Sequence, residues 1–128
     1  MDRPELLELI MDSLKHQFVF VDTAHVIRYM NKAAVERYKG TPAKVGGPIF
    51  ACHKEESKQI ILDVVEAFKE GEDEKMIFNS QDHRTFMRAV RDRDGNLMGY
   101  YERFEPPDGY TVSDKKGPIE WGEKLIGK

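Results

Sequence analysis

The sequence contains one cysteine, no long apolar run and no excess of basic residues. A single cysteine, Cys52, cannot form an internal disulfide and excludes CxxC metal or redox motifs, which is typical of a protein in a reducing compartment. The longest apolar run is far shorter than the roughly 20 residues that a membrane-spanning helix requires. The charged N-terminal residues MDRPELLELI do not resemble a signal peptide. We therefore expect a cytoplasmic protein that does not interact with membranes.

Basic and acidic residues, 20 and 23 in number, are interleaved along the chain and give a net charge of −3. No basic stripe is present, so nucleic acid is not an expected partner. The GxGxxG, phosphate-loop, HExxH and GxSxG motifs are absent as well. Asp92, Asp94 and Glu102 have no base or nucleophile at a matching spacing. The sequence therefore predicts that the protein is not an enzyme, and its 128 residues are enough for one domain with one core.

The chain is organised around residues 45–71, VGGPIFACHKEESKQIILDVVEAFKEG. After a Gly-Gly-Pro break, apolar residues recur at the spacing of one buried helix face, and Gly71 ends this helix. The residues on this face are Ser57, Ile60, Ile61, Val64, Val65 and Phe68. Because the following segments have strand character, we expect the helix to cover a sheet. Cys52 and His53 stand just before the helix, which makes this the expected place for any chemistry.

The first 16 residues predict a flanking helix. Asp2 is its N-cap, with Glu5 as the reciprocal partner three residues later and Pro4 in the first turn. The apolar stripe of this helix consists of Leu6, Leu7, Ile10, Met11 and Leu14. The stripe either packs on its own domain or pairs with a second copy of the chain in a homodimer, and the sequence leaves both readings open.

Two short runs of apolar and β-branched residues, 17–22 and 26–30, flank an Asp-Thr-Ala-His turn and predict a hairpin. Asn31 then caps a short helix over residues 32–39. Residues 41–42, a Thr-Pro pair, predict a further helical turn, because the hydroxyl can act as the cap and proline suits the first helical position.

Three more strand candidates follow at residues 75–80, 84–92 and 97–105, with an Asp-Gly turn between the last two. Each alternates with a period of two, which implies a sheet with one covered face and one wetter face.

These elements divide the chain into a flanking helix (1–16), a domain (17–106) and a polar tail (107–128). The tail is rich in Gly, Lys, Asp and Glu and has too few apolar groups for a core of its own. Trp121 is the residue through which it could dock.

The order of these elements and three sequence patterns resemble a PAS domain. FVFVDTAHVIRYMNKAAVERY is similar to the opening hairpin of that family, VGGPIF to the segment before its long helix, and FMRAVRDRDGNLMGYYERFE to its closing hairpin. The residues that carry the first pattern are Asp22, Ile27, Tyr29, Asn31, Ala33 and Ala34. A narrower resemblance is to PAS modules that follow hemerythrin-like segments in bacterial and archaeal proteins of unknown function. These carry a Cys-His pair before the long helix, here Cys52-His53, although Lys54 stands where proline is usual.

The resemblance implies an α+β fold, with a five-stranded antiparallel sheet covered on one face by helices and a cavity between the long helix and the sheet. Such modules bind a small ligand or cofactor, or a partner protein. We therefore expect a sensory or regulatory module in signal transduction, with a small-molecule ligand and a signalling partner protein. The alternative is a cofactor-free module for dimerisation or protein interaction.

His53 is the candidate ligand for the iron of a b-type haem, since neutral imidazole binds haem iron and some PAS sensors carry such a ligand near this helix. The alternative is a surface histidine near a helix start. Met76 is the candidate for the opposite side of the ring, and Arg84, Arg88 or Arg103 could pair with the propionates.

Cys52 is either a redox-sensing thiol, favoured by the helix N-terminus, or a buried small hydrophobe. The side chains expected to line the cavity beside Cys52 and His53 are Ile61, Val65, Met76, Phe78, Met98 and Tyr100.

Overall fold

The computed structural model describes residues 1–107, except for the side chain of Cys52, so most of the predicted tail, with Trp121, lies outside the described residues. The helices are α1 (Arg3–Asp12), α2 (Lys32–Arg37), the 3-10 helix η1 (Ile49–Cys52) and α3 (Glu55–Lys69). The strands are β1 (Val19–Asp22), β2 (Ile27–Met30), β3 (Glu74–Asn79), β4 (Arg84–Arg91) and β5 (Leu97–Glu105).

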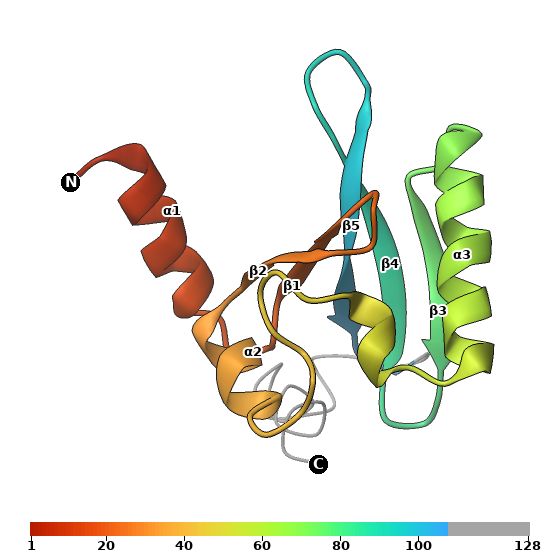
Figure 1. Cartoon of the computed structure of the whole chain (residues 1–128), viewed down its shortest axis with the longest axis horizontal. Coiled ribbons are helices and arrows are strands. Elements are labelled where there is room, and N and C mark those ends of the chain that lie inside the picture. The colour runs from red at the N-terminus through yellow and green to blue at the C-terminus, as the bar shows by residue number, and fades with distance from the viewer. Residues whose placement is uncertain (108–128) are drawn as a thin grey trace.

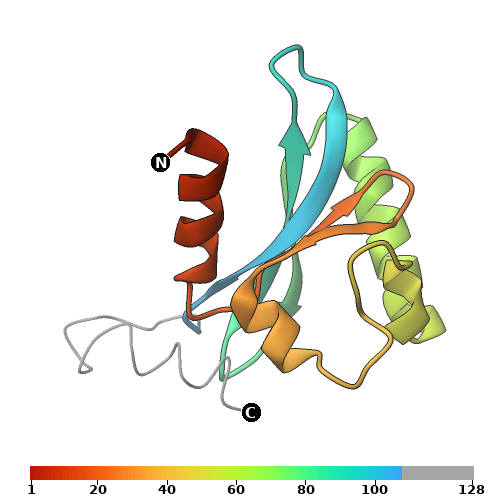
Figure 2. The same ribbon diagram turned by 60° about the vertical axis from the view of Figure 1, so that its left-hand side comes forward.

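The strands form one antiparallel sheet in the order β2-β1-β5-β4-β3, so that the first and last strands in sequence meet inside the sheet. The predicted α+β fold, with five antiparallel strands and an N-terminal helix, is confirmed (Figure 1). α3 runs along one side of the sheet, and α1 stands on the other side (Figure 2). None of the helices within residues 1–107 has the length and apolar composition needed to cross a bilayer.

α3 covers the sheet because its apolar positions fall on one side of the helix. Ile61, Val64, Val65 and Phe68 are buried and belong to the same core cluster as Met87 of β4. The predicted buried face is therefore confirmed at these four positions of the helix and is wrong at Ile60, which is 45% exposed. This packing sets the distance between α3 and the sheet along the rest of the helix.

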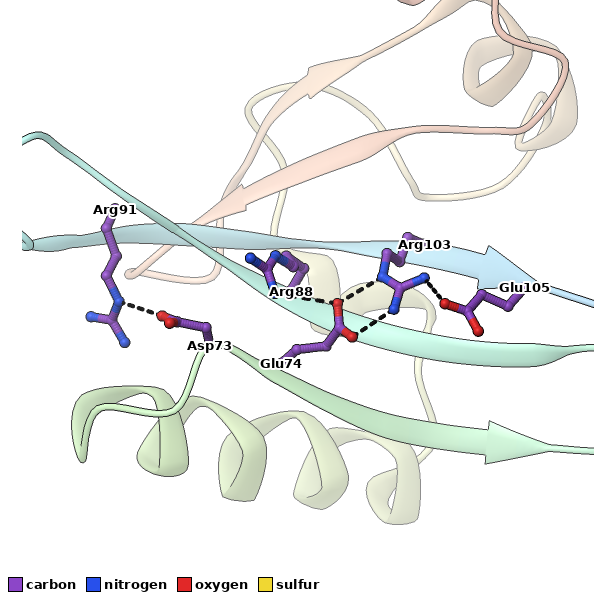
Figure 3. A network of polar contacts seen from close by, with 6 residues as sticks. All are labelled: Asp73, Glu74, Arg88, Arg91, Arg103 and Glu105. Atoms are coloured by element: carbon purple, nitrogen blue, oxygen red, sulfur yellow. Dashed lines mark hydrogen bonds and ion pairs between the residues drawn. The ribbon is translucent and has the colours of Figure 1, made fainter.

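The C-terminal end of α3 is fastened to β4. Gly71 has a φ of 113°, a conformation that favours glycine and ends the helix as predicted. The Arg91 guanidinium donates hydrogen bonds to the carbonyl oxygens of Phe68 (2.7 Å) and Glu72 (2.9 Å). It also pairs with Asp73 at 2.9 Å (Figure 3). The bond to Phe68 gives a partner to a carbonyl group in the last turn of α3 that has none within the helix, and the other two contacts fasten the following residues to β4.

The pairing of β4 with β5 decides which side chains face α3. Thr85 and Met87 of β4 are buried, so the odd-numbered residues of this strand point toward the helix. Tyr100 of β5 pairs with Ala89, and Glu102 pairs with Met87. Directly paired residues share a face, so Tyr100 and Glu102 both point to the side that α3 covers.

Asn31 is fully buried and joins four segments of the chain. Its Oδ1 accepts hydrogen bonds from the backbone N–H groups of Ala34 and Phe18, both at 2.9 Å. The first of these is the predicted cap of α2. Its Nδ2 donates to the carbonyl oxygens of Met11 (2.9 Å) and His16 (3.1 Å). The end of α1 and the link to β1 are thereby tied to the start of α2.

The helical turn predicted at residues 41–42 is wrong, because this segment forms a bend. The Thr41 hydroxyl donates to the carbonyl oxygen of Tyr38 (2.7 Å) and accepts from the backbone N–H of Ala43 (3.2 Å). The group that would cap a helix therefore closes a turn after α2. This turn holds the loop against the cavity described below.

Candidate ligand cavity

A cavity of about 350 Å³ lies between the sheet, Ile61 of α3, the residues of η1 and its C-cap, and the loop after α2. The resemblance to PAS domains implied a cavity between the long helix and the sheet, and this cavity has that position. Most of its wall is apolar. The aliphatic and phenyl side chains that line it are Val19, Val21, Ile27, Ala43, Ile49, Ile61 and Phe104. The side chains with polar groups that line it are Gln17, Tyr38, Thr41, His53, Tyr100, Tyr101 and Glu102.

His53 occupies the C-cap position of η1, immediately before α3, and its half-buried side chain lines the cavity. Its Nδ1 lies 2.8 Å from the carbonyl oxygen of Ile49. A carbonyl oxygen only accepts, so Nδ1 carries the proton in this bond, and in the neutral ring Nε2 carries the lone pair. The short helix η1 thus fixes both the orientation and the tautomer of the imidazole.

Glu102 is the only carboxylate among the described residues that line the cavity. Its side chain has no hydrogen bond or ion pair within residues 1–107. Glu102 is nevertheless an exposed residue, so its carboxylate is hydrated in the free chain, although it lines the cavity on the covered face of the sheet. Partial desolvation by the surrounding chain raises the pKa of the Glu102 carboxyl, and the charge of His53 acts in the opposite direction.

The Tyr100 hydroxyl has a polar partner that is not itself a lining residue. Its hydroxyl lies 3.0 Å from Nδ1 of His25, and the His25 ring packs on Phe50 with 4.8 Å between ring centroids. Burial raises the pKa of Tyr100 and, together with the charge of Lys69, lowers the pKa of His25. Both shifts favour neutral groups, so this hydrogen-bonded pair contributes no charge to the cavity.

The structure brings only some of the predicted site residues together. His53, Ile61 and Tyr100 line the cavity, whereas Val65 is buried in the core and is not part of the wall. The side chain of Cys52 is outside the described part of the chain.

Met76, Phe78 and Met98 do not line the cavity and are about half exposed. The prediction assumed uninterrupted alternation along β3 and β5. The register of β3 against β4 shifts between Met76 and Phe78, and the pairing of β4 with β5 shifts at Val90, opposite the start of β5. Such bulges change the face to which a side chain points, which corrects the predicted lining at these positions.

The arginines predicted to face a cofactor lie elsewhere. Arg103 pairs with Phe86, so it points to the sheet face opposite Glu102. There it donates to both oxygens of Glu74, at 2.7 and 2.6 Å, and to Glu105, and Arg88 approaches Glu74 at 3.5 Å (Figure 3).

The third predicted arginine, Arg84, is similarly engaged, with Glu105 at 3.0 Å and the carbonyl oxygen of Pro106 at 3.0 Å. These contacts hold the β3-β4-β5 part of the sheet together on the side away from the cavity. The wall itself contains no Arg or Lys among its described residues.

Glu102 is the residue that the sequence interpretation passed over. The signal was present, because Glu102 alternates in phase with Tyr100 and Phe104 and is a charged residue on an otherwise apolar strand face. A charge at such a position requires a partner or a function.

Comparison with known proteins supports the fold. A PAS domain family model matches residues 7–105. A C-terminal domain from Streptococcus mutans is 24% identical with a TM-score of 0.64, over 82% of this chain and 85% of that one. A PAS domain from Colwellia psychrerythraea is 14% identical with a TM-score of 0.60, over 82% and 97%.

Vibrio cholerae VqmA, solved in a complex with a ligand and DNA, is 19% identical with a TM-score of 0.56. That match covers all of this chain and 60% of VqmA. At these identities the solved structures show a shared fold and no more. The comparison with curated proteins gives no match.

Proposed function

The chain belongs to the PAS domain family, and from this premise we propose that it is a sensory or regulatory module. The proposed signal is the binding of a small molecule in the cavity beside His53 and Glu102. The proposed output is a change in the position of α3 or of the sheet that a signalling partner protein reads.

The cavity is the observation that carries this proposal. Its volume of about 350 Å³ falls within the range of small-molecule pockets, roughly 300–1,000 Å³. An apolar wall with a few polar groups is also typical of such pockets. VqmA, which shares the fold, was solved with a ligand. That supports the proposal by analogy of fold alone.

His53 is well placed to transmit binding. It ends η1, and Lys54 directly after it is the N-cap of α3. A guest that contacts the imidazole therefore acts one residue away from the start of the helix that covers the sheet. The other end of α3 is held by Arg91, so we expect movement at the start of the helix rather than at its end.

Haem b is the specific cofactor predicted from the sequence, and His53 alone supports it. Its Nδ1 hydrogen bond to a carbonyl oxygen is the arrangement that metal-binding histidines use. The rest of the described wall fits haem poorly, because two propionates need cationic partners and the wall offers a carboxylate instead. A Soret absorption band in the protein purified as expressed, lost in His53→Ala, would restore haem as the guest.

Native mass spectrometry of the full chain purified as expressed tests the proposal. We expect a non-covalent adduct of one small molecule per chain. Ala43→Leu, which extends a side chain into the cavity, should remove the adduct while far-UV circular dichroism stays unchanged. Ala24→Leu, in the exposed β1–β2 turn, is the matched control and should retain it. An adduct that persists in Ala43→Leu would place the guest elsewhere and refute the proposal.

Dimerisation through α1 is the second candidate function, and the exposure of this helix favours it. No residue of α1 is buried, and Leu6, Leu7, Leu9 and Ile10 are each 48 to 53% exposed. Exposed apolar patches of this kind mark interaction surfaces. If a second copy covers them, Leu7→Glu with Ile10→Glu should give a monomer in analytical ultracentrifugation. Arg3→Glu on the same helix should leave the dimer intact, and a dimer that survives the double change would exclude this surface.

A further inference from the structure

We propose that the guest of the cavity carries a cationic nitrogen group, such as an amidine, guanidinium or protonated amine, on a flat apolar body. The nitrogen group would bind the Glu102 carboxylate. This inference rests on the proposed function, since it names the chemical class of the ligand that the same cavity takes.

The position of Glu102 is the first step of the argument. Its pairing with Met87, which is completely buried, places it on the covered face of the sheet. It lines the cavity and has neither a hydrogen bond nor an ion pair within residues 1–107. Because the Glu102 carboxylate is exposed to the cavity, a guest that displaces its water without supplying a partner costs free energy, and a cation with hydrogen-bond donors offsets that cost.

The wall supplies no competing cation. None of its described residues is Lys or Arg, and the arginines of β4 and β5 pair with Glu74, Glu105 and Asp73 outside the cavity. His53 is the group whose charge acts on Glu102, but no hydrogen bond or ion pair joins the two side chains, and the Nδ1 atom of His53 is bonded to the Ile49 carbonyl oxygen. The missing counter-charge therefore has to come from the guest.

The remaining wall selects the body of the guest. Ile61 and Phe104 present apolar surface to the same cavity as Glu102, and the Tyr100 hydroxyl is hydrogen-bonded to His25. A planar apolar group gains from this contact, and a cation near aromatic rings gains further. An anionic guest would meet Glu102 with like charge and would be rejected.

Three probes of nearly equal size and shape separate charge from shape: benzamidine (cationic), benzamide (neutral) and benzoate (anionic). Each is titrated into the isotopically labelled full chain at pH 7, and amide chemical shifts are followed by NMR. The variant Glu102→Gln keeps the size of the side chain and removes its charge. Glu70→Gln, at the exposed end of α3, removes the same charge away from the cavity.

We expect benzamidine to bind at least about tenfold more tightly than benzoate, with shifts centred on Ile61 and residues 100–104. Glu102→Gln should weaken benzamidine by about tenfold or more and leave benzamide within about twofold, because a charge-assisted hydrogen bond is lost only with the cation. Glu70→Gln should change neither.

The cation inference and the proposed function can fail separately. Benzamide or benzoate binding in the cavity as tightly as benzamidine would overturn the cation inference and leave the cavity as a ligand site. The same holds if Glu102→Gln binds benzamidine as wild type does. If no probe shifts the cavity residues and Ala43→Leu retains the native adduct, the proposed function fails as well.

Discussion

Replacement of Asn31 tests how the flanking helix is attached to the domain. The side chain is fully buried and forms four hydrogen bonds, to Ala34, Phe18, Met11 and His16. Asn31→Ala removes all four. Asn31→Asp is nearly isosteric: it retains the oxygen that accepts from two N–H groups and replaces the donor by a second oxygen that faces two carbonyl oxygens.

The magnitude follows from the number of bonds. A buried hydrogen bond contributes about 1 kcal/mol net, so Asn31→Ala should lower the free energy of unfolding by about 4 kcal/mol. A loss of that size shifts Tm by roughly 15 °C or more in a domain of this length. Asn31→Asp should cost about 2 kcal/mol or more, because two bonds become repulsive contacts. It should act mainly on α1, whose end is tied down through Met11.

Urea unfolding monitored by far-UV circular dichroism measures both values. Asn79→Ala, an exposed position on β3 with no side-chain hydrogen bond in the described chain, is the control and should change stability by less than about 0.5 kcal/mol. Hydrogen exchange of Asn31→Asp should show faster exchange in residues 5–17 than in the sheet. If Asn31→Ala costs less than about 1 kcal/mol, the reasoning is refuted.

Two further predictions concern the sheet and the cavity. A Cβ at Gly99 would lie 2.1 Å from the Val21 carbonyl oxygen, so Gly99→Ala should force β1 and β5 apart and cost about 3 kcal/mol in urea unfolding. Gly40→Ala, at φ 82° in open space, should cost only about 1 kcal/mol, and equal costs would contradict the close approach. The raised pKa of Glu102 means that the folded state binds the carboxyl proton more tightly than the unfolded state does. As the pH rises from the pKa of the unfolded state through that of the folded state, this group therefore lowers the stability of the fold. With His53 and tyrosines as the other titratable groups of the described wall, Glu102→Gln should raise Tm at pH 7 by an amount that shrinks toward pH 4. A Tm difference that grows on acidification would contradict the raised pKa of this carboxyl.

Local patterns were sufficient to predict most of the fold. The helix face at Ile61, Val64, Val65 and Phe68 follows from spacing alone, and the alternation of residues 84–91 gave the correct faces of β4. These features depend on residues a few positions apart in the sequence, so the spacing of apolar residues is enough to predict them.

The parts that failed depend on non-local contacts. The bulge between Met76 and Phe78 arises from the pairing of β3 with β4, and no residue within β3 predicts it. Thr41 is a residue type that often caps helices, but its hydroxyl donates a hydrogen bond to the carbonyl oxygen of Tyr38, which precedes it. Asn31 was predicted as a cap, whereas three of its four partners lie 13 to 20 residues earlier in the chain.

The candidate site was predicted in part for the same reason. His53 was found because it stands next to the long helix, and Tyr100 because it alternates with apolar neighbours. The role of Glu102 can be inferred only from the complete set of lining residues, which contains no Lys or Arg among those described. A single acidic residue on a strand is otherwise read as solvated.

The most direct test of the central claim is a crystal structure of the full chain grown with benzamidine. The account predicts density for one planar molecule in contact with Ile61 and Tyr100, with a nitrogen within hydrogen-bond distance of the Glu102 carboxylate. A cavity closed by its own side chains, or one that holds only water while the probe binds elsewhere, would contradict it.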